Sequence, residues 1–375
     1  MTAYLDMNAT SPVLKEVAEL VYEFLVEDYG NAGSRTHEFG AKAKAAVTKA
    51  RKQVANVVDA DSSEVIFTSG ATESNNIALL GLRSFGEIEN KRHIITTRIE
   101  HKAVLEPIEY LASEGFDVTY LEVGENGIVN PNELALALRE DTLLVSIMHV
   151  NNETGSVQPI DEICSVLGCS DAYLHVDAAQ SYGKLSEPLK NTRIDFISAS
   201  GHKLYAPKGI GALVMRRRGF IKPPLKPIMF GGGQEKSLRP GTLAVPLIAG
   251  FGLACEVASK NSAKWQSQAL RLKESLVAEL DKVGAQYNGD NSSPFVLNFS
   301  VPGVNSESLM VALKGIAAVS NGSACTSSSY TPSHVLTAMG LSEDRINGAI
   351  RISWSGMLEK LPVKEIMAKI EQVRM

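Results

Sequence analysis

Short apolar segments alternate with segments of helical periodicity along the middle of the chain, from about residue 60 to about residue 220. The run Thr142–Val150 (TLLVSIMHV) is almost entirely apolar, which is typical of a strand buried on both faces of a parallel sheet. Repeated strand–helix units predict an α/β fold, with a mostly parallel seven-stranded sheet and helices on both of its faces. The strands are expected at residues 64–69, 93–99, 117–123, 142–150, 173–177, 195–199 and 210–216, and the helices at 72–84, 103–114, 132–140 and 160–167.

The pattern changes after the turn-rich residues 222–246. A long helical region follows at 247–283, and strands and helices then mix without regular alternation. A chain of 375 residues suits one large domain and one smaller domain. We therefore expect a large domain over residues 13–255 and a small α+β domain that joins residues 1–12 to 256–375. Its strands are expected at residues 295–301 and 349–354, and its helices at 307–313 and 363–373.

The charge balance argues against a general affinity for nucleic acid. The net charge is −5 and the isoelectric point is near 5.9, so the chain as a whole does not attract phosphate backbones. A local basic cluster is present around a proline-rich turn, and we interpret it as a solvated strand end and surface loop. The cluster consists of Arg216, Arg217, Arg218, Lys222 and Lys226.

The ends and the cysteines favour a cytoplasmic protein without a membrane anchor. The first residues carry neither the basic nor the apolar region of a secretory signal. No uninterrupted apolar stretch approaches the roughly 18 residues that span a bilayer. The cysteines are few and unevenly spaced, unlike a disulfide framework, so we expect reduced thiols. They are Cys164, Cys169, Cys255 and Cys325.

Polar groups follow five of the predicted strands, where open α/β sheets bind their ligands. Thr72 opens a helix after the turn at Gly70, which makes either an anion-binding cup or an ordinary N-cap. Asp177 ends one apolar strand, and Lys203 follows another in the run Ser200-Gly201-His202-Lys203. A carboxylate of this kind can pair with a protonated pyridine nitrogen, and a lysine amine can form a Schiff base. The other two strands are followed by His101 and Asn152.

Cys325 stands apart from the other cysteines. It lies in a run of small and polar residues, 319–329, which predicts an exposed and mobile loop. Because free cysteines are usually buried, an exposed one favours a catalytic role. Cys255 falls on the apolar face of a helix and is expected in the core, and no further metal ligands accompany Cys164 and Cys169. We therefore expect no metal site.

These segments together resemble the class V aminotransferase family of fold-type-I pyridoxal-phosphate enzymes, and within it the NifS/IscS-like cysteine desulfurases. The resemblance covers essentially the whole chain. One departure is Ala206, where relatives commonly carry glycine. The matching segments are Tyr4–Val13 (YLDMNATSPV), Phe67–Asn76 (FTSGATESNN), Glu100–Val104 (EHKAV), His149–Gly155 (HVNNETG), His175–Gln180 (HVDAAQ), Ser200–Leu213 (SGHKLYAPKGIGAL) and Gly231–Thr242 (GGGQEKSLRPGT).

The resemblance assigns a role to each candidate residue. It implies that Lys203 is the Schiff-base lysine of pyridoxal 5′-phosphate, that Asp177 binds the ring nitrogen and that His101 stacks on the ring. It further implies that Gln180 binds the phenolic oxygen and that Asn152 lies beside the ring. The phosphate would be held by Ala71, Thr72, Ser200 and His202, and by Thr242 of the neighbouring subunit in a homodimer; Asn31, Asn152 and Arg351 would bind the substrate, Arg351 through its carboxylate.

The reaction implied by the resemblance is the removal of sulfur from L-cysteine. Lys203 would take the α-proton, Cys325 would become a persulfide, and L-alanine would leave, with His101 assisting proton transfer near the thiols. The persulfide would pass to an acceptor protein. A transaminase or lyase of the same fold has no use for a thiol at Cys325. A selenocysteine lyase is harder to distinguish from a cysteine desulfurase by sequence. A scaffold protein that merely kept the fold would not need Lys203.

Three segments sharpen the resemblance further. They look most like the cysteine desulfurases of bacterial DNA phosphorothioation systems, with the desulfurases of iron–sulfur cluster assembly or tRNA thiolation as the alternative. DNA would then be modified by partner proteins, without direct contact with this acidic chain. The segments are Glu153–Pro159 (ETGSVQP), Met229–Thr242 (MFGGGQEKSLRPGT) and Thr331–Leu336 (TPSHVL).

Overall fold

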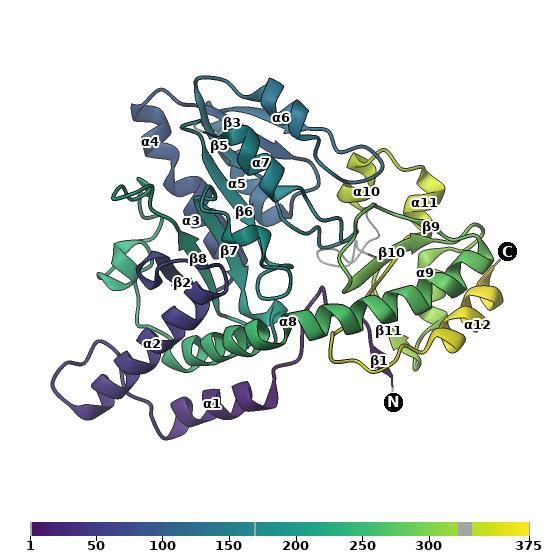
Figure 1. The fold of residues 1–375 in the computed structure, drawn as a ribbon, viewed down its shortest axis with the longest axis horizontal. Helices are drawn as coiled ribbons and strands as arrows, with labels where there is room; N and C mark the ends of the chain where they lie inside the picture. Colours follow the sequence, from purple (N-terminus) through teal and green to yellow (C-terminus); the bar gives the residue numbers. More distant parts are fainter. Residues whose placement is uncertain (1, 169, 322–331, 375) are drawn as a thin grey trace.

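A central seven-stranded sheet dominates the computed structural model, which describes residues 2–168, 170–321 and 332–374 (Figure 1). The strand order is β2-β8-β7-β6-β5-β3-β4, and only β8 runs against its neighbours. The prediction of a mostly parallel seven-stranded sheet is therefore confirmed. The strands are β2 (Val65–Thr68), β3 (His93–Thr97), β4 (Asp117–Leu121), β5 (Thr142–Ser146), β6 (Tyr173–Asp177), β7 (Phe196–Ser200) and β8 (Gly211–Met215).

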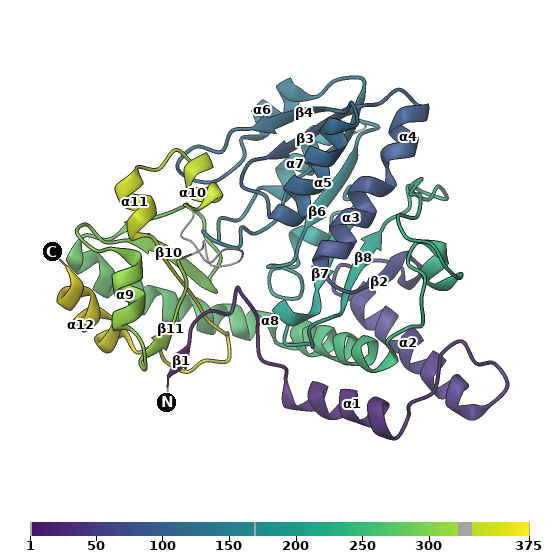
Figure 2. The ribbon, with the colours of Figure 1, turned by 180° about the vertical axis from the view of Figure 1, so that it is seen from behind.

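Helices cover both faces of the sheet, and Figure 2 shows them from behind. Alternate strand residues enter two separate cores: Ile66 of β2 packs with α3 and α5 on one face, and its neighbours Val65 and Phe67 pack into the larger core on the other. Burial on both faces explains why these strands are apolar throughout. The helices are α1 (Lys15–Val26), α2 (Glu38–Asn56), α3 (Ala71–Gly81), α4 (Arg83–Ile88), α5 (Lys102–Ser113), α6 (Pro131–Ala137) and α7 (Ile160–Leu167).

Two features differ from the sequence expectations. The strand expected at 142–150 ends at Ser146, although the amides of Ile147 and His149 still donate to the carbonyls of β6 residues. The helices α1 and α2 were not expected. The buried face of α2 is built from small residues such as Ala43, Val47 and Ala50, which give only a weak periodic signal.

The C-terminal part of the chain forms a second α+β unit. Its three-stranded antiparallel sheet has the order β12-β10-β9, and the N-terminal strand β1 pairs in parallel with β11, Ala3 opposite Ala317. The helix α8 is 36 residues long and runs from the large sheet to this unit (Figure 1). The boundary expected between residues 255 and 256 falls inside α8, and the division into domains remains a prediction. The elements are β1 (Ala3–Tyr4), α8 (Val245–Leu280), β9 (Gln286–Tyr287), β10 (Val296–Ser300), α9 (Ser306–Ala312), β11 (Ala317–Ala318), α10 (His334–Ala338), α11 (Glu343–Gly348), β12 (Ile350–Ser353) and α12 (Val363–Val373).

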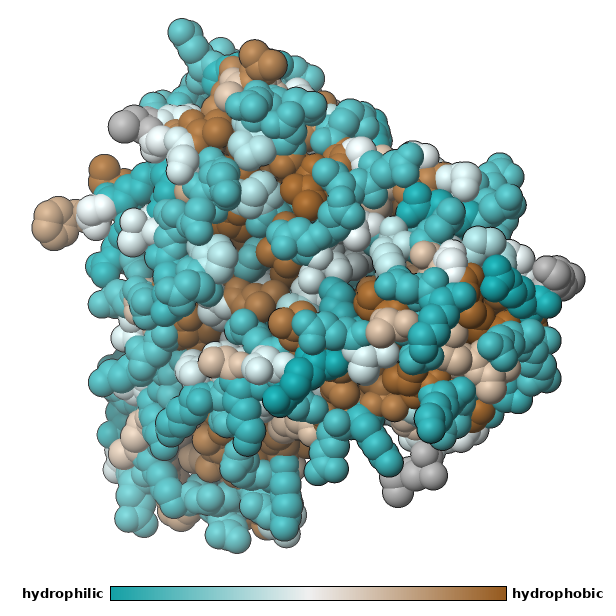
Figure 3. All heavy atoms as spheres, turned by 45° about the vertical axis from the view of Figure 1, so that its right-hand side comes forward, coloured by the Kyte–Doolittle hydropathy of each residue, from teal (hydrophilic) through white to brown (hydrophobic). Residues whose placement is uncertain are grey.

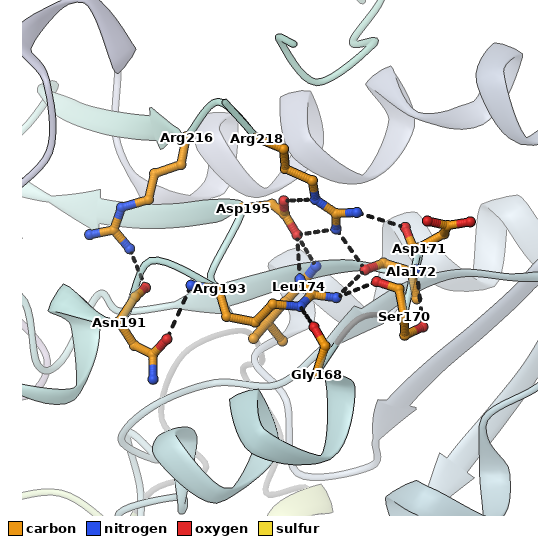
Figure 4. A network of polar contacts seen from close by, with 10 residues as sticks. All are labelled: Gly168, Ser170, Asp171, Ala172, Leu174, Asn191, Arg193, Asp195, Arg216 and Arg218. Carbon is orange, nitrogen blue, oxygen red and sulfur yellow. Dashed lines mark hydrogen bonds and ion pairs between the residues drawn. The ribbon is translucent and has the colours of Figure 1, made fainter. Parts of the chain in front are cut away.

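An arginine–aspartate network closes the amino ends of β6 and β7 (Figure 4). Arg193 and Arg218 both donate to the carboxylate of Asp195, which is 2% exposed. Each guanidinium nitrogen of these two arginines has an acceptor. Arg216 is also buried and donates to backbone carbonyls. The interpretation of the cluster as a solvated strand end is therefore wrong for Arg216 and Arg218, which bind backbone carbonyls, whereas Arg217, Lys222 and Lys226 are exposed. The carbonyls involved belong to Val58, Gly168, Ser170, Asp171, Ala172, Leu189 and Asn191.

Along the described ranges, no helix is long and apolar enough to cross a bilayer. Figure 3 shows one face of the molecule, on which hydrophobic residues form separate patches between hydrophilic ones.

Candidate active site

A cavity of about 550 Å³ lies at the carboxyl ends of the parallel strands. Its volume is in the range of small-molecule binding sites. Loops and helix starts that follow β2, β3, β5, β6 and β7 converge on it, together with the N-terminal segment and one residue of β12. Most of the predicted site residues line this cavity: Ala71, Thr72, His101, Asn152, Asp177, Gln180, Ser200, His202, Lys203 and Arg351.

Two of the described candidate residues do not belong to this lining. Asn31 lies on an exposed turn between α1 and α2, and Thr242 is exposed in the segment that leads into α8. Neither residue lines the cavity. Cys325, the predicted nucleophile, lies outside the described residues, so its role stays a prediction.

The start of α3 forms one wall of the cavity. Gly70 has a φ of 156°, which side-chain-bearing residues rarely adopt, and a Cβ there would lie 3.6 Å from Ser200 Oγ. The first N–H groups of a helix have no acceptor within it and carry the positive end of the helix dipole. The hydroxyls of Thr72 and Ser200 border the same space. This wall therefore has the chemistry of an anion-binding cup.

His202 lies beside this cup and is held by the N-terminal segment. Its Nδ1 is 3.1 Å from Thr10 Oγ1. Burial, together with the charges of the neighbouring Lys203, Lys208 and Lys184, lowers the pKa of His202 to about 4. The imidazole is therefore neutral at pH 7, and it acts as a hydrogen-bonding group and not as a charge.

Asp177 is a buried carboxylate at the end of β6. One oxygen accepts a 2.7 Å hydrogen bond from Asn75 Nδ2, and the other accepts a 2.9 Å bond from the Ala179 amide. Asn75 was missed in the sequence, where it looked like any polar residue one turn into a helix. The Oδ1 of Asn75 has no hydrogen bond within the described ranges. Asn75 thus orients the carboxylate toward the cavity from behind.

His101 caps α5 from the opposite side of the site. Its Nδ1 accepts a 3.1 Å hydrogen bond from the Ala103 amide, so the proton of the neutral ring is on Nε2. Burial lowers the pKa of His101, an effect that Asp177 opposes and Lys203 reinforces. A neutral ring with a fixed tautomer can stack on an aromatic ligand and can exchange a proton through Nε2.

Lys203 directs its amine at the N-terminal segment. Its Nζ donates to the carbonyls of Asn8 and Ala9 at 2.5 Å and 2.6 Å. The Asn8 carbonyl also accepts from Gln180 Nε2 at 3.0 Å. A second amine is close, since Lys203 contributes to lowering the pKa of the buried Lys184 to about 7, mainly a burial effect. The contact of residues 8 and 9 with the amine of Lys203 could not be predicted, because backbone carbonyls carry no residue-specific signal.

Arg351 enters the cavity from β12. Its side chain is almost fully buried, and its NH2 forms a 2.7 Å ion pair with Asp6. NH1 donates to the Asn152 carbonyl at 3.0 Å, and Nε has no acceptor among the residues described. Asp6 was not singled out in the sequence. It lies in the segment that matched the family, but its partner is 345 positions away.

Glu100 is a second buried carboxyl group that the sequence did not indicate. Its Oε1 accepts from the Met148 amide at 2.9 Å and from the Thr97 hydroxyl at 3.1 Å. Its Oε2 has no partner in the described parts of the chain. Burial raises the pKa of Glu100 to about 8, and the charge of Asp177 adds to this. The group is therefore mostly protonated at neutral pH.

The described cysteines are not suited to chemistry. Cys255 is completely buried in α8, as expected, and burial raises its pKa far above the usual range. Cys164 is buried in α7, and burial raises its pKa to about 12. Cys169 lies outside the described residues. Thiols of this kind stay protonated and unreactive.

The polar groups of the cavity fit pyridoxal 5′-phosphate. Two buried oxygens in its lining, Gln180 Oε1 and Asn152 Oδ1, lack a hydrogen-bond partner among the described residues. Buried polar atoms are rarely left unpaired, so a polar ligand is expected beside them. The anion-binding wall at Thr72 suits a phosphate, and the carboxylate of Asp177 suits a protonated ring nitrogen.

Known proteins share this fold and sequence. The sequence pattern of the class V aminotransferases matches residues 3–360. A cysteine desulfurase IscS of Shewanella putrefaciens is 47% identical over 355 residues, which cover 93% of this chain and 87% of that protein. The crystal structure of DndA from Streptomyces lividans has 50% identity and a TM-score of 0.82, and covers 94% of this chain and 99% of that one.

Another similar structure contains a bound amino acid. The structure of SspA in complex with cysteine has 39% identity and a TM-score of 0.81, covering 94% of this chain and 98% of that one. The class V pattern spans nearly the whole sequence, and the relatives called cysteine desulfurases match it over most of both chains. The chain therefore belongs to the class V aminotransferase family and, within it, to the pyridoxal-phosphate-dependent cysteine desulfurases.

Proposed function

We propose that this enzyme removes sulfur from L-cysteine in the cytoplasm, releases L-alanine and carries the sulfur as a persulfide on Cys325 to an acceptor protein. The observation that carries the proposal is the convergence of Lys203, Asp177 and Arg351 on one cavity. An amine, a carboxylate and a guanidinium so placed suit an amino-acid substrate bound over a pyridine ring.

Each side chain has a place in holding the cofactor. Thr72, Ser200, His202 and the first amides of α3 bind the phosphate. Asp177 pairs with the ring nitrogen, and Asn75 keeps its carboxylate turned toward the cavity. The ring of His101 would stack on the cofactor, and the amides of Gln180 and Asn152 would bind its polar groups. When bound, the cofactor supplies an aldehyde for the substrate amine and a ring that takes up the electron pair of the α-carbon.

The chain's own residues carry the proton and the sulfur. Arg351 binds the substrate carboxylate, and Lys203 Nζ accepts the α-proton. The thiolate of Cys325 forms an S–S bond to the substrate sulfur while the C–S bond of the substrate breaks. The remaining carbon skeleton takes up protons, for which His101 Nε2 is suitably placed, and leaves as L-alanine. No external oxidant or reductant is needed.

We also propose a homodimer in which Thr242 of one subunit binds the phosphate of the other. Thr242 is exposed and does not line the cavity of its own chain, which agrees with a role across an interface. Large apolar side chains are also exposed on and after α1: Tyr22, Leu25, Val26 and Tyr29. Burial of such side chains favours association.

For the pathway, we propose sulfur supply to DNA phosphorothioation. The support is the 50% identity to DndA over 94% of the chain, together with the three segments that resemble that group. Supply of sulfur to iron–sulfur clusters or tRNA is the alternative, favoured by the 47% identity to IscS. Deleting the gene and measuring DNA phosphorothioates by mass spectrometry separates the two, since only the first pathway loses that modification.

The activity is tested with purified protein, pyridoxal 5′-phosphate and L-cysteine. We expect L-alanine to form and Cys325 to gain the mass of one sulfur atom. Lys203→Ala should abolish turnover, and Cys325→Ser should abolish the persulfide, whereas Cys164→Ser, a buried control, should retain both. Alanine formation without a persulfide on Cys325 would refute the assigned nucleophile. A selenocysteine lyase would instead release selenium and leave L-cysteine unchanged.

A further inference from the structure

The guanidinium of Arg351 faces the cavity and also pairs with a carboxylate of the chain itself. Arg351 lines the cavity, yet its NH2 pairs with Asp6 at 2.7 Å. The side chain of Asp6 is 22% exposed and that of Arg351 is 4% exposed. The Nε of Arg351 remains without an acceptor in the described part of the chain. A ligand carboxylate therefore meets an arginine that already has one negative partner.

Asp6 cannot easily move away from Arg351. It forms a β-bridge with Ser353, two residues after Arg351. Its carbonyl accepts from the Ala9 amide at 3.0 Å and from the Tyr4 hydroxyl at 3.1 Å. Because the backbone is held on both sides, the carboxylate stays within reach of the guanidinium when a ligand is bound.

We infer that Asp6 is a built-in counter-ion that weakens the hold of Arg351 on ligand carboxylates and thereby speeds the release of L-alanine. The inference rests on the proposed function, in which Arg351 binds the carboxylate. Asp6 acts through Arg351 and is a positioning residue, not a catalytic one. It keeps the buried guanidinium paired in the empty site, and its charge repels a second carboxylate.

The direction of the effect follows from the charges. With Asp6 present, one guanidinium faces two carboxylates, and two like charges a few ångströms apart in a partly buried site repel each other appreciably. Removing the charge of Asp6 leaves the ligand as the only counter-ion of Arg351. We expect roughly tenfold tighter binding of an amino-acid carboxylate, an order-of-magnitude value.

The test compares Asp6→Asn with the unaltered holoenzyme. Asparagine keeps the shape and an acceptor oxygen but not the charge. The dissociation constant of L-alanine is measured by calorimetry and from the absorbance of the bound cofactor, which do not depend on turnover. Ethylamine, which is L-alanine without its carboxylate, serves as the second ligand. Asp6→Glu retains the charge, and Glu125→Gln removes the acid of a more exposed arginine pair, Arg345–Glu125.

We expect Asp6→Asn to bind L-alanine roughly tenfold more tightly, with ethylamine unaffected, and to show stronger product inhibition. Asp6→Glu and Glu125→Gln should match the unaltered enzyme. Unchanged or weaker binding of L-alanine by Asp6→Asn, with Arg351→Gln also weakened, overturns the inference and leaves the proposed function standing. If Arg351→Gln binds L-alanine as well as the unaltered enzyme, the carboxylate site itself is wrong.

Discussion

The two ends of the central sheet differ in how completely their buried polar groups are paired. At the amino ends of β6 and β7, Asp195 accepts from two arginines and from the Leu174 amide, and Arg193 and Arg218 use every guanidinium nitrogen (Figure 4). At the carboxyl ends, buried polar atoms of Gln180 and Asn152 lack partners within the described ranges. The same strands therefore end in a completed network on one side and in an incomplete one on the other.

The difference separates stability from function. A fully paired buried network costs much to break, because removal of one partner leaves a buried charge. An incomplete network contributes less to stability, but its free hydrogen-bonding atoms are available to a ligand. Mutations at the amino ends should therefore mainly lower stability, and mutations at the carboxyl ends should mainly lower activity. Each end has an aspartate at the end of a strand, so the same kind of substitution can be compared at both.

The largest expected effect is at the amino end. Asp195→Ala removes the acceptor of two arginines and of the Leu174 amide, and it should lower the free energy of unfolding by about 3 kcal/mol. Urea denaturation measures this value. The control is Asp117→Ala, which breaks the exposed pair Asp117–Arg139 and should leave the midpoint unchanged. Equal effects of both variants would mean that the network does not stabilise the fold.

A pH-dependent effect of comparable size is expected at Glu100, behind the cavity. The pKa of Glu100 is about 8 in the folded chain, against an ordinary value of 4.5. The folded state thus keeps a proton that the unfolded state loses, and this group's contribution to stability falls as pH rises from 4.5 to 8. Glu100→Gln mimics the protonated acid and avoids this loss.

Unfolding free energies of Glu100→Gln and the unaltered chain should be nearly equal at pH 5. At pH 7 the variant should be more stable by about 3 kcal/mol, an order-of-magnitude conversion of the pKa difference. Denaturant titrations at both pH values measure it. A difference that does not grow with pH would show that Glu100 is ionised in the folded protein.

The smallest effect on stability is expected at Asp177. Asp177→Asn keeps the acceptor for the Ala179 amide, and a turn of the Asn75 amide lets its unpaired Oδ1 accept from the new side chain. The free energy of unfolding should change by less than about 1 kcal/mol. Turnover of L-cysteine should nevertheless fall by at least about a hundredfold, since the ring nitrogen loses its charge partner. Retained turnover would contradict the role proposed for Asp177.

The fold was largely predictable from the sequence because its strands are buried on both faces. Apolar runs such as Thr142–Val150 mark those strands, and the polar residues after them mark the edge where the cavity lies. The role of each lining residue came from the family resemblance, since a lone Asp177 or His101 is equally compatible with a structural role. Their positions in one cavity agree with that resemblance.

What sequence reasoning missed depends on contacts between distant residues. Asp6 pairs with Arg351, and the carbonyls of Asn8 and Ala9 hold the amine of Lys203. Neither contact leaves a periodic or compositional signal. Arg216 and Arg218 were misinterpreted for the same reason: a basic run looks solvated until the carbonyls that it binds are known.

The N-terminal segment has a consequence for synthesis on the ribosome. Asp6 is made 345 positions before its partner Arg351. At about 5–20 residues per second, the segment waits on the order of tens of seconds for that partner. All strands of the large sheet are synthesised well before Arg351. The part of the cavity wall that Arg351 forms is therefore missing when those strands have already emerged. A nascent chain can thus fold most of its sheet while its substrate site is still incomplete, so the enzyme cannot act on free cysteine before Arg351 has been made.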